Sequence, residues 1–165
     1  MPLTTYTTYD EVRAALGVSK TELPDPVVSL TQWDTLTVIG LEDVNLGIPA
    51  FYAIVSAIAS NARSTAEQRF YDLTRLYACY NLAQTLLVSL PMFSVKRLTD
   101  GRAEFDRQSD IYADVRDGVR GMQSMLRLKL SASFVILSPG AILFNSGNFD
   151  RTVSTGLAID PVTNT

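Results

Sequence analysis

Residues 64–91 place the tightest limit on how this chain can fold. Ser64 and Glu67 have the spacing of a capping box, in which each side chain satisfies a backbone N–H of the first helical turn. Beyond this box, apolar side chains recur at alternating intervals of three and four residues: Leu73, Leu76, Tyr80, Ala83, Leu87 and Leu90. The continuous seam predicts one long amphipathic helix, which Pro91 ends.

Four other segments carry helix signals. Thr8 and Glu11 form a second capping box, and Gly17 is a natural C-terminal stop. Asp25 followed by Pro26 is a typical helix start, with the aspartate as N-cap. The predicted helices run from Thr8 to Gly17, from Asp25 to Leu41, from Ile48 to Ser60 and, capped by Ser109, from Asp110 to about Leu130.

The pattern changes between the two long helices. Asp100-Gly101 readily supplies the positive φ angles of a two-residue type I′ turn, so residues 94–106 predict a β-hairpin. The expected register places Arg97 opposite Glu104, a favourable cross-strand pair. A lone hairpin is marginally stable in water, so we expect it to lean on a helix or on a neighbouring subunit.

Residues 131–165 differ in composition from the rest of the chain. Their only charged residues are Asp150, Arg151 and Asp160. Residues 134–137 and 141–144 are strand-like apolar runs, and residues 152–159 are also β-prone. We expect an extended arm that a partner completes, for example through its sheet edge.

These elements predict a mainly α fold, namely a small helical bundle with a β-hairpin and an extended C-terminal arm with β-prone segments. The length of 165 residues suffices for one domain with a hydrophobic core. We place the helical domain at residues 1–130, including the hairpin at 94–106, and the docking arm at residues 131–165.

Composition argues against catalysis. The chain has no histidine, which excludes Ser-His-Asp and Cys-His relays, most transition-metal sites and the commonest general base near neutral pH. The single cysteine, Cys79, lies in an apolar helical stretch, where it is expected to be a small core side chain. We therefore expect no enzyme activity, no catalytic residue and no cofactor.

Composition also limits the location and the partners. No run approaches the roughly 20 apolar residues of a membrane helix, so no membrane contact is expected. The N-terminus lacks the basic and apolar regions of a signal peptide, which predicts a protein made and kept in a cytoplasm. A net charge of −3 argues against binding nucleic acid by charge neutralisation.

Three groups of charged residues are candidate sites. The row Asp106, Asp110, Asp114 and Asp117 has the spacing of one helix face and would suit Mg²⁺ or Ca²⁺. Interleaved arginines favour an ordinary solvated face, so no metal site is expected. Arg63, Arg69 and Arg75 form a second group, and Lys96, Arg97 and Arg102 on the hairpin form a third. The hairpin group would touch a phosphate backbone or an acidic partner, unless its residues only keep an edge strand soluble.

Tyrosines crowd the N-terminus beside several threonines. Tyrosine combines a large apolar area with a polar group, which suits interfaces. The alternative is a frayed terminus that contains helix caps. The residues that we expect at a partner interface are Tyr6, Tyr9, Arg97, Arg102, Phe134, Ile136, Ile142, Phe144 and Phe149.

An ordered set of motifs resembles one family. The set comprises residues 6–18 (YTTYDEVRAALGV), 22–25 (ELPD), 65–77, 89–93 (SLPMF), the 99–101 turn (TDG) and 160–163 (DPVT). Together they resemble the head-to-tail connector (adaptor) proteins of tailed bacteriophages. The resemblance covers nearly the whole chain, except residues 134–150, where it is weakest.

The resemblance implies a virion protein of the neck, made in the host cytoplasm. Such a protein forms a homo-oligomeric ring, typically of twelve copies, beneath the portal protein. The ring extends the channel through which genomic DNA passes without specific binding, and it docks the next neck or tail-completion protein. An acidic lining fits such a channel, because a basic one would hold DNA back.

Other functions fit the same residues. The nearest is another neck or tail-completion protein that forms a ring. A second is a small helical regulator that binds a host protein or DNA, and a third is a carboxylate-metal hydrolase built on the acidic row.

Overall fold

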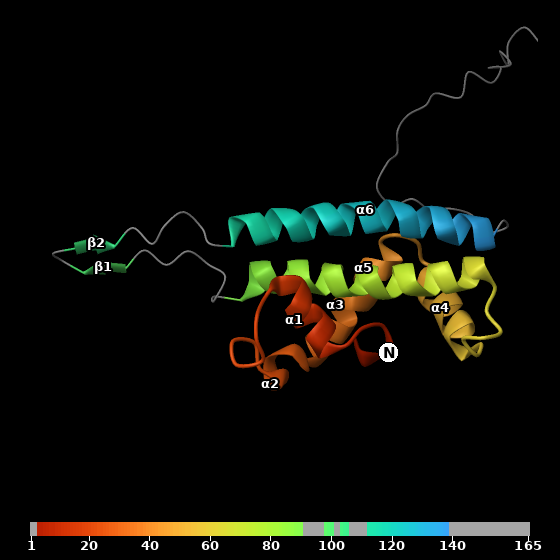
Figure 1. The fold of residues 1–165 in the computed structure, drawn as a ribbon, viewed down its shortest axis with the longest axis horizontal. Coiled ribbons are helices and arrows are strands. Elements are labelled where there is room, and N and C mark those ends of the chain that lie inside the picture. The colour runs from red at the N-terminus through yellow and green to blue at the C-terminus, as the bar shows by residue number, and fades with distance from the viewer. Residues whose placement is uncertain (1–2, 91–97, 101–102, 106–111, 139–165) are drawn as a thin grey trace, which may run out of the picture.

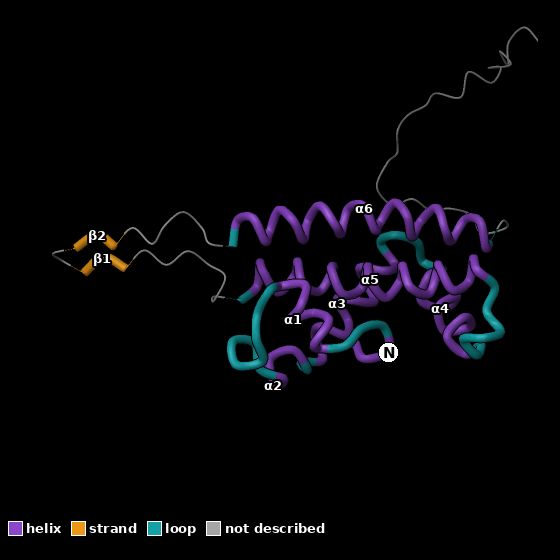
Figure 2. Tube along the Cα trace, in the orientation of Figure 1, coloured by secondary structure: helices purple, strands orange, loops and turns teal. Residues whose placement is uncertain are grey.

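The computed structural model describes residues 3–90, 98–100, 103–105 and 112–138. This part of the chain is mainly helical, as predicted (Figures 1 and 2). Its elements are a 3₁₀ helix η1 (Leu3–Thr5), helices α1 (Tyr9–Leu16), α2 (Asp25–Val28), α3 (Thr31–Glu42), α4 (Ile48–Ala57), α5 (Thr65–Ser89) and α6 (Ala113–Leu137), and strands β1 (Leu98–Asp100) and β2 (Ala103–Phe105).

Helix α5 is the central layer of the fold. Helices α5 and α6 each have 25 residues and lie antiparallel, side by side, while α1 to α4 lie on the other side of α5 (Figure 1). Because α5 has neighbours on several sides, its buried residues extend well beyond the predicted seam. Leu76, predicted in that seam, is 48% exposed, whereas Ala78 and Leu82 are buried.

The core consists of two clusters along α5. The first joins Val12 and Leu16 of α1 and Trp33 of α3 to the C-terminal half of α5. The second joins α4, the N-terminal half of α5 and the C-terminal half of α6, and it includes Tyr6. Each fully buried large side chain of this kind contributes roughly 1.5–3 kcal/mol.

The predicted capping boxes and the stop at Gly17 are confirmed. The Thr8 hydroxyl accepts from the Glu11 N–H, and the Glu11 carboxylate accepts from the Thr8 N–H at 2.9 Å. Ser64 and Glu67 form the same box at the start of α5. Gly17 has φ 67°, and hydrogen bonds from residues 17 and 18 to the last turn of α1 close a Schellman motif there.

The helix predicted from Asp25 to Leu41 is broken in two. Asp25 is the first residue of α2 and not its N-cap, because its carboxylate is held by Arg13 and Lys20. Leu30 is extended, with φ −64° and ψ 132°, and separates α2 from α3. The Trp33 indole N–H donates to the Val27 carbonyl at 2.7 Å, so tertiary packing compensates for the break.

Helix α6 corrects the predicted start of the arm. The strand predicted at residues 134–137 is wrong, because α6 continues through Leu137. Short apolar runs do not distinguish strand from helix by periodicity, and packing decides here. The Phe134 ring lies 5.7 Å from the Phe51 ring and 6.1 Å from the Phe70 ring, measured between centroids. Residues 139–165 and the predicted cap Ser109 lie outside the described residues.

Strands β1 and β2 pair antiparallel (orange in Figure 2). Glu104 lies opposite Thr99, and Leu98 lies opposite Phe105. The predicted register paired Glu104 with Arg97 instead. Arg97, Gly101 and Arg102 lie outside the described residues.

Candidate interaction surfaces

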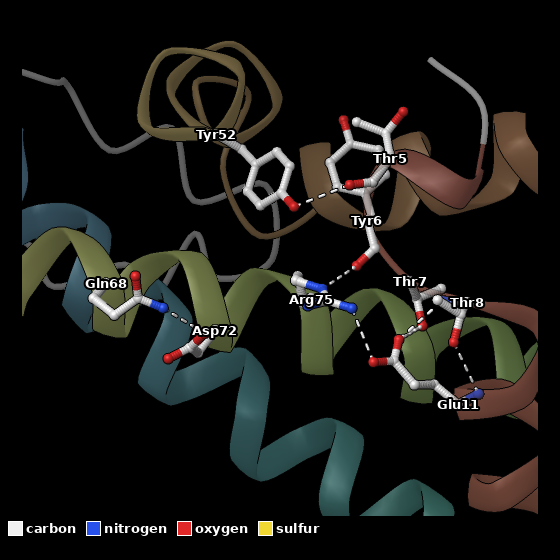
Figure 3. Close-up of polar contacts among 9 residues, drawn as sticks. All are labelled: Thr5, Tyr6, Thr7, Thr8, Glu11, Tyr52, Gln68, Asp72 and Arg75. Atoms are coloured by element: carbon white, nitrogen blue, oxygen red, sulfur yellow. Dashed lines mark hydrogen bonds and ion pairs between the residues drawn. The ribbon is translucent and has the colours of Figure 1, made fainter. Parts of the chain in front are cut away.

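A polar cluster joins the N-terminal segment to the middle of α5 (Figure 3). The Arg75 guanidinium donates to the Tyr6 carbonyl at 3.1 Å and to Glu11 Oε1 at 2.9 Å. The other oxygen of Glu11 accepts from the Thr7 hydroxyl at 2.8 Å. One ion pair therefore closes a loop between residues 64 positions apart in the sequence.

Hydrogen bonds and a neighbouring charge favour the ionised form of Glu11. Burial alone would raise the pKa of Glu11, but hydrogen bonds from Thr8 and Thr7 and the charge of Arg75 outweigh it and lower that pKa. A short distance away, burial and the neighbouring Tyr71 raise the pKa of Tyr52. The Tyr52 hydroxyl donates to the Thr5 carbonyl at 3.0 Å (Figure 3). These contacts fasten the N-terminus to the bundle.

The predicted interface residues fall into three groups. Tyr6 and Phe134 are only 1% and 2% exposed, so both lie in the core of the bundle. Tyr9 is half-buried against the first core cluster, whereas Ile136 is 72% exposed near the end of α6. The remaining predictions, Arg97, Arg102, Ile142, Phe144 and Phe149, lie outside the described residues.

A groove follows the uncovered side of α5. Three hollows of about 280, 570 and 390 Å³ line up along it. The first two share Leu76, and the last two share Thr65 and Arg69. At one end the wall is α6, through Lys129 and Ile136 among others. We call this feature the α5/α6 groove.

A second exposed apolar surface lies on α3. Leu36 is 38% exposed and Ile39 is 45% exposed, and Asp43, directly after α3, is exposed on the same side of the helix. Leu46, in the following loop, is 67% exposed. We call Leu36, Ile39 and Asp43 the α3 ridge.

Charge separates these two surfaces. Residues 21–62, which include α2, α3 and α4, contain Glu22, Asp25, Asp34, Glu42 and Asp43 but no lysine or arginine. The lining of the groove is mainly basic, with Arg63, Arg69, Arg75 and Lys129 beside Glu11 and Asp72. The exposed Arg69 and Lys129 form no ion pair within the described part of the chain. Sequence reasoning named Arg69, with Arg63 and Arg75, as a candidate basic patch, but it missed Lys129 and the absence of lysine and arginine from residues 21–62.

The other candidate sites are the single cysteine and the acidic row. Cys79 is buried as predicted, and burial raises the pKa of its thiol to about 11. No three His, Cys, Asp or Glu residues gather to hold a metal ion within the part of the chain that the structure describes. Asp114 and Asp117 are exposed, while Asp106 and Asp110 lie outside that part.

None of the described helices is both long and apolar enough to cross a membrane. Comparison with known proteins gives no relative, since no family profile, curated protein or solved structure matches the chain.

Proposed function

We propose that this chain is a structural, non-enzymatic subunit of the neck of a tailed bacteriophage. In this proposal, copies form a ring beneath the portal protein that extends the DNA channel and docks the next neck or tail protein. The basis is the ordered motif set described above together with the mainly helical bundle, which suits a connector.

One observation carries the proposal furthest. Two separate faces of a well-packed bundle expose large aliphatic side chains, at Leu36 and Ile39 on one face and at Leu76 and Ile136 on another. Single exposed apolar residues are ordinary, but neighbouring ones, such as Leu36 and Ile39 one turn apart on α3, are typical of protein-interaction sites. A subunit in a ring needs contacts with two neighbours.

The contact with the portal is assigned to residues 139–165. This stretch holds only three charged residues, so burying it against another protein desolvates few charges. It follows α6 directly, at the end where Ile136 is exposed. DNA would pass the ring without specific binding, consistent with the net charge of −3.

Loss of the protein from the phage tests this function. Without the gene, DNA-filled heads that lack tails should accumulate, and the purified protein should restore tail attachment. Labelled protein should lie at the head–tail junction in electron micrographs of whole virions. Normal infectious particles without the protein, or a label elsewhere, would overturn the proposal.

A truncation after Ser138 tests the portal contact. It removes the uncharged stretch but keeps all of α6, including the buried Phe134. The truncated protein should keep the far-ultraviolet circular dichroism of a helical bundle and lose binding to purified portal. Unchanged binding would show that another surface meets the portal.

A further inference from the structure

Resting on the proposed ring function, we infer how neighbouring copies touch: the α3 ridge of one copy lies in the α5/α6 groove of the next. The contact is therefore heterologous, with a different surface on each partner. Its components are aliphatic side chains at the centre and opposite charges at the edge.

The two surfaces face away from each other across the bundle. Asn81 of α5 packs against Gly40 of α3, and the Tyr77 hydroxyl donates to the Gly40 carbonyl at 3.1 Å. With 3.6 residues per turn, Arg69 and Leu76 lie about 120–140° around α5 from Asn81. On α3, Leu36 and Asp43 lie about 40–60° around the helix from Gly40, on the side next to α6. There Arg127 of α6 donates to the Asp43 carbonyl at 2.9 Å, and Lys129, which flanks the groove, lies about 160° around α6 from Arg127. A copy thus presents the ridge on one side and the groove on the other.

Charge complementarity selects a second copy as the occupant of the groove. Arg69 and Lys129 form no ion pair with described residues of their own chain, although both flank the groove. The ridge lies within residues 21–62, where every charged residue is acidic, and Asp43 is exposed on it. Docking the ridge would bring the exposed Asp43 carboxylate, which forms no ion pair within the described residues, near these two cations. This favours the encounter over ridge on ridge or groove on groove.

The apolar parts of the two surfaces also correspond. The ridge offers Leu36 and Ile39, and the groove offers Leu76 and Ile136, which are 48% and 72% exposed. Contact between two copies would remove all four from water. Because each copy uses two different surfaces, addition continues until a rotation closes a ring. An interface that used the same surface twice would stop at a dimer.

Two exposed-surface variants test the contact in the full-length chain. The ridge variant is Leu36→Ser with Ile39→Ser, and the groove variant is Arg69→Glu with Lys129→Glu. We expect the unmodified protein to self-associate beyond dimers as its concentration rises in analytical ultracentrifugation. Each variant alone should bind its own copies at least about 30-fold more weakly, which corresponds to about 2 kcal/mol.

Mixing the variants gives the decisive result. The ridge variant keeps an intact groove, and the groove variant keeps an intact ridge. An equimolar mixture should therefore form 1:1 dimers and nothing larger, because the second contact is broken on both sides. Arg120→Glu is the control. It makes the same charge change as Lys129→Glu on the opposite side of α6, about 180° around the helix axis, and it should associate like the unmodified chain.

Three results would overturn the inference: an unmodified protein that stays monomeric at every concentration, variants that associate as well as it does, or a mixture that forms no dimer. These outcomes leave the neck function standing if the labelled protein still lies at the head–tail junction. Conversely, if the variants behave as expected but the protein is absent from the neck, the proposed function is wrong and the inferred contact stands.

Discussion

The carboxylate of Glu11 and the guanidinium of Arg75 meet at 2.9 Å across the surface between α1 and α5. Glu11 serves two purposes at once, since it also completes the capping box at Thr8. Arg75 likewise binds the backbone of Tyr6. The pair therefore couples the local start of a helix to the long-range attachment of the N-terminus.

This coupling predicts a pH dependence. The pKa of Glu11 is lowered in the folded chain, so its contribution is present above its ordinary pKa of 4.5 and is lost as the pH falls through the lower folded value. Glu11→Gln keeps a capping side chain but removes the charge. Urea unfolding should show a loss of roughly 0.5–1 kcal/mol at pH 7 and a shallower decline below about pH 4.5 than in the unmodified chain.

A double-mutant cycle with Arg75→Met separates the ion pair from the cap. The two changes together should cost less than the sum of the single changes by a few tenths of a kcal/mol or more. Strict additivity, or parallel pH profiles for Glu11→Gln and the unmodified protein, would contradict this account.

Gly40 should resist even the smallest enlargement. A Cβ at this position would lie 2.2 Å from Nδ2 and 2.8 Å from Cγ of Asn81, although alanine would otherwise favour the helix by about 1 kcal/mol. We expect the clash to win, with Gly40→Ala lowering the free energy of unfolding by about 1–2 kcal/mol. Thermal and urea denaturation measure the effect.

Two further variants test whether the clash with Asn81 causes this loss of stability. Adding Asn81→Ala to Gly40→Ala should restore part of the stability, because it removes the colliding atoms. Gly121→Ala is the matched control, since its Cβ would meet nothing within 4 Å, and it should be neutral or stabilising. If Gly40→Ala also stabilised the protein, the close contact between α3 and α5 would be wrong.

Substitutions in the last turns of α6 should have very different effects on stability, depending on whether the side chain is buried or exposed. Phe134→Ala removes a ring packed against Phe51 and Phe70 and should cost about 3–5 kcal/mol. Ile136→Ala, at a side chain that is 72% exposed, should change stability by less than about 0.5 kcal/mol. Equal effects on urea unfolding would mean that residues 134–137 are not helical in solution.

Cys79 should be unreactive while the protein is folded. The thiol is buried and its pKa is raised to about 11, so thiolate is scarce at neutral pH. Labelling with a chromogenic disulfide reagent should be at least about 100-fold slower than after unfolding in urea. Val88→Cys, at a position that is 78% exposed, should label at once and shows that the reagent is active.

Local signals in the sequence predicted much of the helical framework. The capping boxes at Thr8 and Ser64 and the stop at Gly17 involve neighbours within a few residues, so their chemistry is legible without a fold. The burial of Cys79 followed from its apolar surroundings. The break at Leu30 could not be predicted from neighbouring residues. It depends on the hydrogen bond from Arg13 to the Leu23 carbonyl, the ion pair of Arg13 with Asp25 and the hydrogen bond from the Trp33 indole to the Val27 carbonyl.

Tertiary structure decided which side chains are surface. Tyr6 has the composition of an interface residue, yet it is buried because Tyr52 and Arg75, far along the chain, close over it. Phe134 begins a strand-like run, yet an aromatic cluster holds it in a helix. Both outcomes depend on contacts between distant residues, which hydrophobic patterning does not encode.

The sequence by itself determined a mainly helical chain without histidine-based chemistry and with an acidic stretch free of lysine and arginine from 21 to 62. Only the tertiary structure placed that stretch on one side of α5 and left Arg69 and Lys129 on the other. Charge content is fixed by the residues present, whereas the separation of charge in space is fixed by which helices pack together.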